Sequence, residues 1–292
     1  MESSRHKIQH EEIMKYLLSI ISMFFLLSIV SSPAHGQQVI RISGATTVQP
    51  VVELIAEQFT QLTGQRFAVQ GGGSLTGAQD VMEGDSHLGM VSRSLSPFEK
   101  ERLEYVTLGL DALVFIVNER NPLNEINLET VTALFTGQVV NWNELIDWDR
   151  EVVLVSKEMG RSTLELFEEY SGLHHRDNSS PGKNGYVSGR AYEIGSNLDG
   201  ITLVGGVPGA VGYMSLGTTI YLMEKGMPVK ILKLNGLIAD KEYIIKGEYP
   251  ITRELNLVYL KENEELVSEF IEYCQGPKAQ EIVLELKYFP VK

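Results

Sequence analysis

The sequence predicts an α/β protein folded into two lobes with a cleft between them. Strand-like and helix-like segments alternate along the chain, which is the pattern of a parallel, doubly wound sheet. Two long strand-like segments, residues 112–118 and 251–260, lie on either side of a middle block. A chain that leaves one lobe and later returns needs two such connections. We therefore assign residues 37–114 and 247–292 to lobe 1 and residues 115–246 to lobe 2.

Lobe 1 is expected to begin with three strands separated by two helices. The strands are predicted over residues 39–43, 67–70 and 87–93. The helices are predicted over residues 48–64 and 76–84, where apolar side chains recur at helical spacing and a glycine ends each segment.

The remaining segments continue the alternation without a sequence repeat or a low-complexity linker. They are a helix and turn over residues 128–145, a strand, loop and helix over 150–172, strands over 209–217 and 229–236, and two helical stretches over 262–286 joined at Gly276 and Pro277.

The first 36 residues are typical of a secretory signal peptide. Lys15 precedes an almost purely apolar run over residues 16–30, and small residues follow at Ala34 and Gly36. The run is short for a membrane span of roughly 20 residues, although a retained anchor helix is the alternative. We expect cleavage after Gly36 and a mature protein in the periplasm.

Charge and cysteine content exclude several classes of function. The formal net charge of −13 argues against nucleic acid, because a phosphate backbone attracts clustered Lys and Arg. It does not argue against a small anion, which local dipoles and a few cations can hold. The single cysteine, Cys274, cannot form an internal disulfide or a cysteine metal cluster, and we expect it to be a buried apolar residue.

One local pattern occurs three times: a strand, a turn of small or hydroxylated residues, then the start of a helix. The three turns are SGATT at residues 43–47, GGGS at 71–74 and SKEMGRST at 156–163. Helix N-termini offer unpaired N–H donors and a partial positive charge, glycines allow close approach, and hydroxyls add donors. Three such turns at the edge of a cleft can surround a tetrahedral oxyanion.

Each turn, taken alone, also fits a purely structural role. Thr47 and Ser74 are good helix caps, and Ser162 with Glu165 fits a capping box. A capped helix can still offer its remaining N–H groups to a ligand. The hypothesis of an anion site therefore rests on the threefold recurrence.

Three cationic residues lie near these turns. Lys157 and Arg161 flank the third turn, where they are either a surface pair or charge-assisted donors to an anion. Arg93 ends a predicted strand, and it either contacts the ligand or forms a salt bridge between the lobes.

The chain closely resembles the periplasmic phosphate-binding proteins of ABC transporters, the PstS-like family. The matching stretches cover nearly all of residues 39–290 in order: SGATTVQP, GGGSLTGAQDVMEGDSHLGMVSRSLS, ALVFIVN, LFTGQVVNWNEL, GAVGYMSLG, YPITRELNLVYL and FIEYCQGPKAQEIV. The resemblance implies a type II periplasmic-binding-protein fold that closes about a hinge. It also implies capture of inorganic phosphate, delivery to the permease of an ABC transporter, a monomer, no cofactor and no enzymatic activity.

The family's binding positions carry over residue by residue. They fall on Ala45, Thr46, Thr47, Ser74, Ser92, Lys157, Arg161, Ser162 and Thr163. Lys157 takes the place of the family's arginine, and Arg161, Ser162 and Thr163 take the place of its Ser-Gly-Thr run. Arg93, which follows Ser92, is a further candidate. Ser92 departs from the family pattern, which has an aspartate there. An aspartate accepts a proton from the ligand and never donates one, whereas a serine does either. The preference for phosphate over sulfate is therefore expected to be weaker here than in the family.

Other functions remain as alternatives. The ligand is another tetrahedral oxyanion, such as sulfate or molybdate, or the protein is a secreted phosphate-releasing hydrolase or docks on a sensor. A hydrolase needs a nucleophile or a metal beside the anion, and the sequence indicates neither. No Gly-x-x-x-x-Gly-Lys-Ser/Thr motif is present, and we expect His174 and His175 to be solvated loop residues, not metal ligands.

Overall fold

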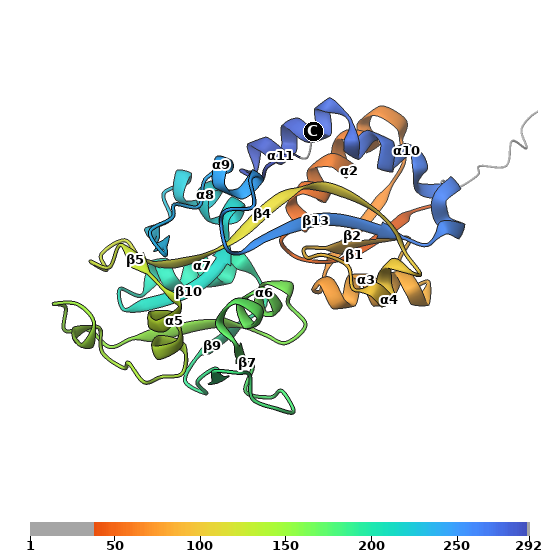
Figure 1. Ribbon diagram of the computed structural model, residues 1–292. Coiled ribbons are helices and arrows are strands. Elements are labelled where there is room, and N and C mark those ends of the chain that lie inside the picture. The colour runs from red at the N-terminus through yellow and green to blue at the C-terminus, as the bar shows by residue number, and fades with distance from the viewer. Residues whose placement is uncertain (1–37, 291–292) are drawn as a thin grey trace, which may run out of the picture. The chain divides into compact units, whose positions relative to one another are not determined.

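The computed structural model describes residues 38–290 (Figure 1). The predicted signal peptide and its cleavage site lie outside the described residues. The chain from Val39 onward forms one compact unit. No helix in this described part has both the length and the apolar character needed to cross a bilayer.

A single mixed sheet of nine strands runs through the unit. The strand order is β2-β1-β3-β13-β4-β10-β6-β9, and β11 also pairs with β4. The strands are β1 (Ile40–Gly44), β2 (Phe67–Gly71), β3 (Leu88–Val91), β4 (Glu104–Asn118), β6 (Val153–Lys157), β9 (Tyr192–Ile194), β10 (Ala210–Ser215), β11 (Val229–Ile231) and β13 (Thr252–Tyr259). Two short pairs lie apart from it: β5 (Glu125–Ile126) with β12 (Lys233–Leu234), and β7 (Leu173–His174) with β8 (Gly185–Tyr186).

The long strand β4 connects the two ends of this sheet. Its first part pairs antiparallel with β13, and its second part pairs antiparallel with β10 and β11. The outer groups β2-β1-β3 and β10-β6-β9 are parallel, as the alternating pattern predicts. The expectation of a purely parallel sheet is wrong in the centre, because the chain returns through β13 in the opposite direction.

Helices cover the sheet and were only partly predicted. They are α2 (Gln49–Thr63), α3 (Ser74–Glu83), α4 (Pro97–Lys100), α5 (Leu128–Phe135), α6 (Ser162–Ser171), α7 (Asn197–Gly206), α8 (Leu216–Glu224), α9 (Lys241–Ile245), α10 (Glu264–Gln275) and α11 (Pro277–Glu285), with 3-10 turns η1 (Trp142–Glu144) and η2 (Lys261–Asn263). The sequence analysis missed α7 and α8, which contain glycines and β-branched residues of low helix propensity. The single strand predicted over 229–236 is divided between β11 and β12.

Two main hydrophobic cores divide the unit. One is built from residues 112–251, which we call the middle half. The other lies among α2, α10, α11 and the strands beside them, and a smaller cluster packs under α3. Both of these belong to residues 38–111 and 252–290, which we call the terminal half. Cys274 is buried in the second core, as predicted.

Side chains inside the middle core also hold the strand that leads to the third turn. Tyr213 stacks on Phe167, with ring centroids 4.0 Å apart. Its hydroxyl is hydrogen-bonded to Ser156 Oγ at 2.7 Å and accepts the Lys157 backbone N–H at 3.2 Å. The end of β6 is therefore fixed before the chain enters the turn.

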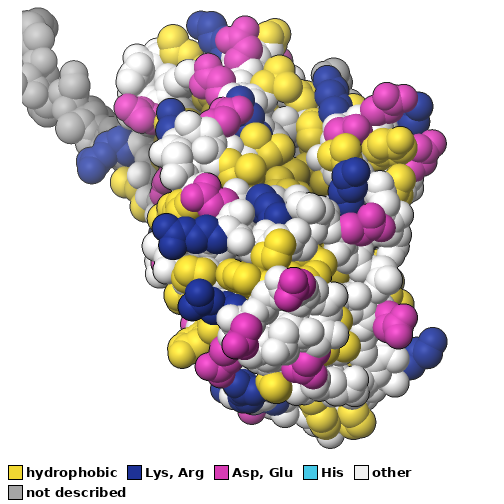
Figure 2. Space-filling view, turned by 90° about the vertical axis from the view of Figure 1, so that its left-hand side faces the viewer, with side chains coloured by type: hydrophobic (Ala, Val, Ile, Leu, Met, Phe, Trp, Pro, Cys, Tyr) yellow, Lys and Arg dark blue, Asp and Glu magenta, His cyan; other side chains and the backbone are white. Residues whose placement is uncertain are grey.

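The surface carries both signs of charge. On the face shown in Figure 2, acidic and basic side chains are interspersed, and neither sign forms a continuous patch.

One prediction about the loop histidines is wrong. We expected both His174 and His175 to be solvated, but the His175 side chain is 3% exposed, and its Nε2 lies 3.2 Å from Glu193 Oε1.

Candidate functional site

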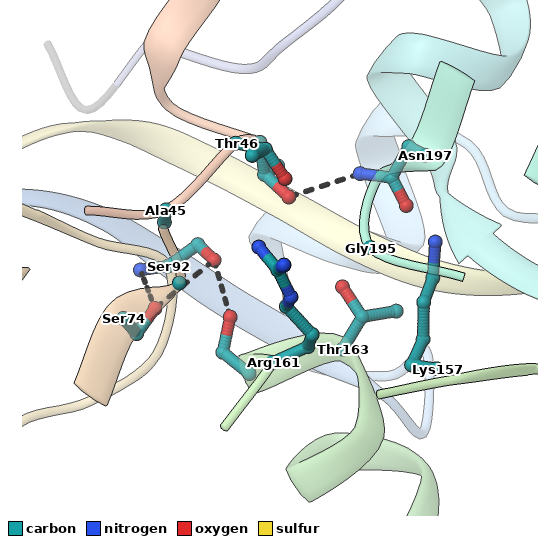
Figure 3. Close-up of a pocket in the computed structure, with 12 residues that line it drawn as sticks. Ala45, Thr46, Ser74, Ser92, Lys157, Arg161, Thr163, Gly195 and Asn197 are labelled. Carbon is teal, nitrogen blue, oxygen red and sulfur yellow. Dashed lines mark hydrogen bonds between the residues drawn. The ribbon is translucent and has the colours of Figure 1, made fainter. Parts of the chain in front are cut away.

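A small polar pocket lies between the two halves (Figure 3). It is lined by Ala45, Thr46, Thr47, Gly73, Ser74 and Ser92 of the terminal half and by Lys157, Arg161, Ser162, Thr163, Gly195 and Asn197 of the middle half. Its cavity volume of about 10 Å³ is far below the roughly 300–1,000 Å³ of pockets for drug-sized ligands. Every predicted site residue except Arg93 lines this pocket, which is suited to a small ligand.

Three helices begin at the pocket without a side-chain cap. Their N-cap residues are Val48 for α2, Gly73 for α3 and Arg161 for α6, and within residues 38–290 no side-chain oxygen caps any of these three ends. The predicted capping role of Thr47, Ser74 and Ser162 is therefore wrong, and so is the capping box of Ser162 with Glu165.

Other helices of the same protein show what a capped end looks like. The first N–H groups of α5, α7 and α8 are capped by Asn127, Ser196 and Ser215, whose side chains accept from the backbone. Because α3 and α6 have no such cap, their first-turn N–H groups and positive dipole ends are available at the pocket, which their first residues line. This is the arrangement that attracts an anion. At α2 the Gln49 N–H donates to the Ala45 carbonyl oxygen at 3.0 Å, and Pro50 has no N–H.

Hydroxyl groups of both halves meet in the pocket. The backbone N–H of Ser92 donates to Ser74 Oγ at 2.9 Å, and Ser92 Oγ is hydrogen-bonded to Ser162 Oγ in the other half. Asn197 Nδ2 donates to Thr47 Oγ1 at 2.9 Å, again from one half to the other. The structure therefore shows the two halves closed on the pocket.

Of the twelve described residues that form the pocket wall, two are cationic and none is acidic. Lys157 is 2% exposed, and its Nζ donates to the Ser196 carbonyl at 2.7 Å. Burial, with the positive charge of Arg253 nearby, lowers the pKa of Lys157 to about 7. Arg161 is partly exposed and pairs with Glu158 at 2.8 Å. A bound anion would supply the counter-charge that buried Lys157 lacks.

Glycine at position 73 allows the two halves to approach each other. Gly73 has φ = 120°, and a Cβ there would lie 2.7 Å from the carbonyl oxygen of Gly160 across the pocket. A side chain would therefore strain the turn and also collide with the facing loop.

Arg93 lies outside the pocket. Its Nη1 and Nη2 each lie 2.8 Å from a carboxylate oxygen of Glu99, and its Nε lies 2.8 Å from Glu165 Oε2 on α6. Arg93 thus forms salt bridges to glutamates of both halves. A salt bridge between the lobes is one of the two roles that the sequence left open for Arg93.

Three residues at or beside the pocket were missed by the sequence analysis. Gly195 and Asn197 precede and begin α7, and Ser196 with Asp199 carries the cap signal that could have revealed this helix. Arg253 lies in a predicted strand, but its guanidinium Nη1 donates to Thr163 Oγ1 at 2.9 Å. No local signal indicates that contact. Among the described residues no group of three or more His, Cys, Asp or Glu side chains could hold a metal ion.

A polar pocket between two halves of an α/β fold is the architecture of a substrate-binding protein. Residues 31–278 match the PBP superfamily domain, and the chain belongs to that superfamily. The family resemblance and the two-lobe α/β fold class predicted from the sequence are thereby confirmed.

The relatives are phosphate-binding proteins. The phosphate-binding protein PstS of Bacillus subtilis is 27% identical over 257 residues, 86% of this chain and 80% of that protein. Similar solved structures include a phosphate ABC transporter substrate-binding protein with bound phosphate from Clostridium perfringens (29% identical, TM-score 0.77, covering 87% of this chain and all of that one). An ABC-type phosphate transport receptor from Vibrio cholerae is 28% identical, with a TM-score of 0.69 over 86% of this chain and 99% of that one.

Proposed function

We propose that this protein binds inorganic phosphate outside the cytoplasmic membrane and delivers it to the permease of an ABC transporter. The observation that carries the proposal is the pocket itself, where the uncapped N-termini of α3 and α6, several hydroxyls and two cations converge without an acidic side chain. The relatives named as phosphate-binding proteins and the similar structure with bound phosphate support the choice of ligand.

The anion would be held from both sides. Backbone N–H groups at Thr46 and Thr47 and the hydroxyl of Ser74 would bind it from the terminal half. The expected backbone donor at Ala45 is not available, because its N–H donates to the Met90 carbonyl oxygen at 2.8 Å. From the middle half the donors are Lys157, Arg161, Ser162 and Thr163. Ser92 lies between the two sets, hydrogen-bonded to both serines. Contacts to both halves favour the closed state, so ligand binding would drive closure.

The lobes are assigned as in the sequence analysis, with residues 37–114 and 247–292 in lobe 1 and 115–246 in lobe 2. The separate hydrophobic cores support this division, because one is built almost wholly from residues 112–251. Cleavage after Gly36 and a periplasmic monomer complete the proposal. The net charge of −13 supports a protein that does not bind nucleic acid.

Calorimetric titration with phosphate, sulfate and molybdate tests the proposal. Replacing Ser74 or Thr163 by Ala should weaken phosphate binding by about 1–3 kcal/mol each, since each removes a hydrogen bond to a buried anion. Ser268→Ala, on the exposed face of α10, is the matched control and should leave affinity unchanged. Unchanged affinity in both pocket variants would refute the site.

A second oxyanion is the competing ligand, and Ser92 is the observation that favours it. Because a serine does not require a ligand proton as an aspartate does, sulfate or molybdate can also fit. Phosphate should raise the melting temperature of the purified protein. If millimolar phosphate has no effect while sulfate or molybdate does, the ligand assignment is wrong and the pocket assignment stands.

A further inference from the structure

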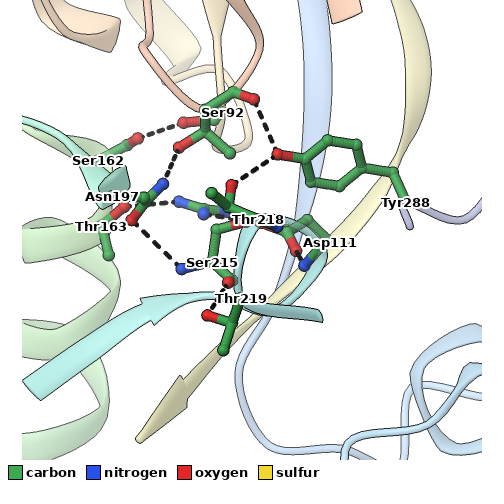
Figure 4. Close-up of polar contacts among 12 residues, drawn as sticks. Ser92, Asp111, Ser162, Thr163, Asn197, Ser215, Thr218, Thr219 and Tyr288 are labelled. Atoms are coloured by element: carbon green, nitrogen blue, oxygen red, sulfur yellow. Dashed lines mark hydrogen bonds and ion pairs between the residues drawn. The ribbon is translucent and has the colours of Figure 1, made fainter. Parts of the chain in front are cut away.

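Two side chains, Asn197 in the pocket wall and Arg253 beside it, bind the oxygen atoms of two pocket hydroxyls (Figure 4). Asn197 Nδ2 donates to Thr47 Oγ1, and Arg253 Nη1 donates to Thr163 Oγ1, both at 2.9 Å. An amide NH₂ and a guanidinium can only donate, so each threonine oxygen is the acceptor. The hydroxyl proton of each threonine is then left for another partner.

Neither donor is free to turn away. Asn197 Oδ1 accepts the backbone N–H of Ser215 at 3.3 Å, which fixes the amide so that Nδ2 faces Thr47. Arg253 is held by the fully buried carboxylate of Asp111, with Nε and Nη2 at 2.9 and 2.7 Å from Oδ2. The other oxygen of Asp111 accepts the Gly217 N–H at 3.1 Å. Both donors are therefore anchored to elements that do not line the pocket.

We propose that Asn197 and Arg253 are positioning residues that direct the hydroxyl protons of Thr47 and Thr163 toward the bound anion. The inference rests on the proposed function, since it needs an anion in the pocket. A free hydroxyl rotates among several partners, whereas one that already accepts a bond from behind donates forward. The two threonines thus favour a ligand that presents unprotonated oxygens.

The bond from Asn197 also couples this orientation to closure. Thr47 belongs to the terminal half and Asn197 to the middle half, 150 residues apart in the sequence. Thr47 therefore becomes an oriented donor only when the halves have met. Thr163 is oriented from the strand β13, which crosses between them.

A double-mutant cycle on Thr47 and Asn197 tests the proposal, with phosphate affinity measured by calorimetry. Thr47→Val removes the hydroxyl, and Thr47→Ser keeps it. Thr47→Val and Asn197→Ala should each weaken binding about tenfold. Adding Asn197→Ala should change affinity less than about twofold in the Val background and about tenfold in the Ser background. An equal effect in both backgrounds would overturn the proposal, because Asn197 would then act without the Thr47 hydroxyl.

The arms of the cycle separate this inference from the proposed site. If Thr47→Val binds phosphate like the wild type, the inference fails, while the site, which uses the Thr47 backbone N–H, is judged by the Ser74 and Thr163 variants. If Thr47→Val weakens binding and Asn197→Ala does not, only the inference fails. An equivalent double-mutant cycle tests Arg253 and Thr163. It combines Arg253→Lys, which keeps a cation beside Asp111, with Thr163→Val in one arm and with Thr163→Ser in the other. Thermal unfolding of each variant confirms that it is folded.

Discussion

Lys157 carries the charge that is most sensitive to what occupies the pocket. Its side chain is buried, and burial together with Arg253 lowers its pKa to about 7 in the closed structure. An anion beside the ammonium group favours the charged form and raises this pKa again. The affinity of the pocket for anions is therefore linked to the protonation of one lysine.

Phosphate binding to the closed state should be accompanied by proton uptake at about pH 8, because a pKa of about 7 leaves Lys157 mainly neutral in that state. Below about pH 6 the uptake at Lys157 should vanish, because the lysine is already charged. Calorimetry in two buffers of different ionisation enthalpy measures the uptake. Lys157→Arg stays charged throughout and serves as the control for protons exchanged by phosphate itself. Identical proton uptake in the wild type and this variant would contradict the assignment.

Ser92 should control the selectivity between phosphate and sulfate. It is fully buried between Ser74 and Ser162, so an aspartate there would face the ligand as an acceptor. Ser92→Asp should raise the ratio of phosphate to sulfate affinity by at least about tenfold, because sulfate has no proton to donate. Ser92→Asn, which is similar in shape and uncharged, is the control. Competition titrations that show equal losses for both anions would exclude this role.

At the scale of elements, the pocket depends on where three helices begin. Serines 74 and 162 are the first residues of α3 and α6 and do not cap them; their hydroxyls face the pocket and are hydrogen-bonded to Ser92. The turn before α3 has a conformation that only glycine adopts readily, with φ = 120° at Gly73. The start of α3 can therefore approach the loop at Gly160 closely.

Gly73→Ala should weaken phosphate binding about tenfold or more, since the strained backbone costs on the order of 1–3 kcal/mol and the new Cβ meets the other half. Gly84→Ala at the other end of α3 is a matched control. Gly84 has φ = 81° and open space around its Cβ position, so the change strains the backbone without touching the pocket. Parallel calorimetry and thermal unfolding distinguish the two. Comparable losses of affinity in both variants would argue against the close approach at Gly73.

At the scale of the whole molecule, contacts between the halves decide how readily the pocket closes. Besides the hydroxyl contacts, Arg93 joins Glu99 of the terminal half to Glu165 of the middle half. The Glu165 side chain is 39% exposed, and burial raises its pKa although Arg93 is adjacent. An ion pair of this kind contributes about 0–1 kcal/mol.

Arg93→Met should lower the free energy of unfolding more than it lowers phosphate affinity. The buried Glu99 loses two charge-assisted bonds, which should cost about 1.5–3 kcal/mol in urea unfolding. The phosphate affinity of Arg93→Met should fall by less than about fivefold, because only the weak ion pair between the halves is lost. The Glu165→Gln variant, which loses the same ion pair, should show a similarly small fall in phosphate affinity. If Arg93→Met instead abolishes binding while stability is retained, Arg93 contacts the ligand directly.

Local features of the fold and site could be predicted because they depend on residues close together in sequence. Apolar spacing indicated α2, α3 and the strands around them, and the hydroxyl-rich turns indicated where an anion pocket would form. The family resemblance then located nine of the ten predicted residues in that pocket. Helix α7 was missed because its glycines weaken the helical pattern, although Ser196 marks its start.

The sequence by itself determined an α/β chain with three anion-attracting turns, since turn chemistry and periodicity are local properties. Only the tertiary structure decided how those turns combine. The crossing of β4 and β13 brings Thr163 to Arg253 across 90 residues, and closure brings Thr47 to Asn197 across 150. Such pairings depend on how the strands cross and how the halves meet, which local patterns do not encode. They are also the contacts that make these threonines oriented donors in the proposed site.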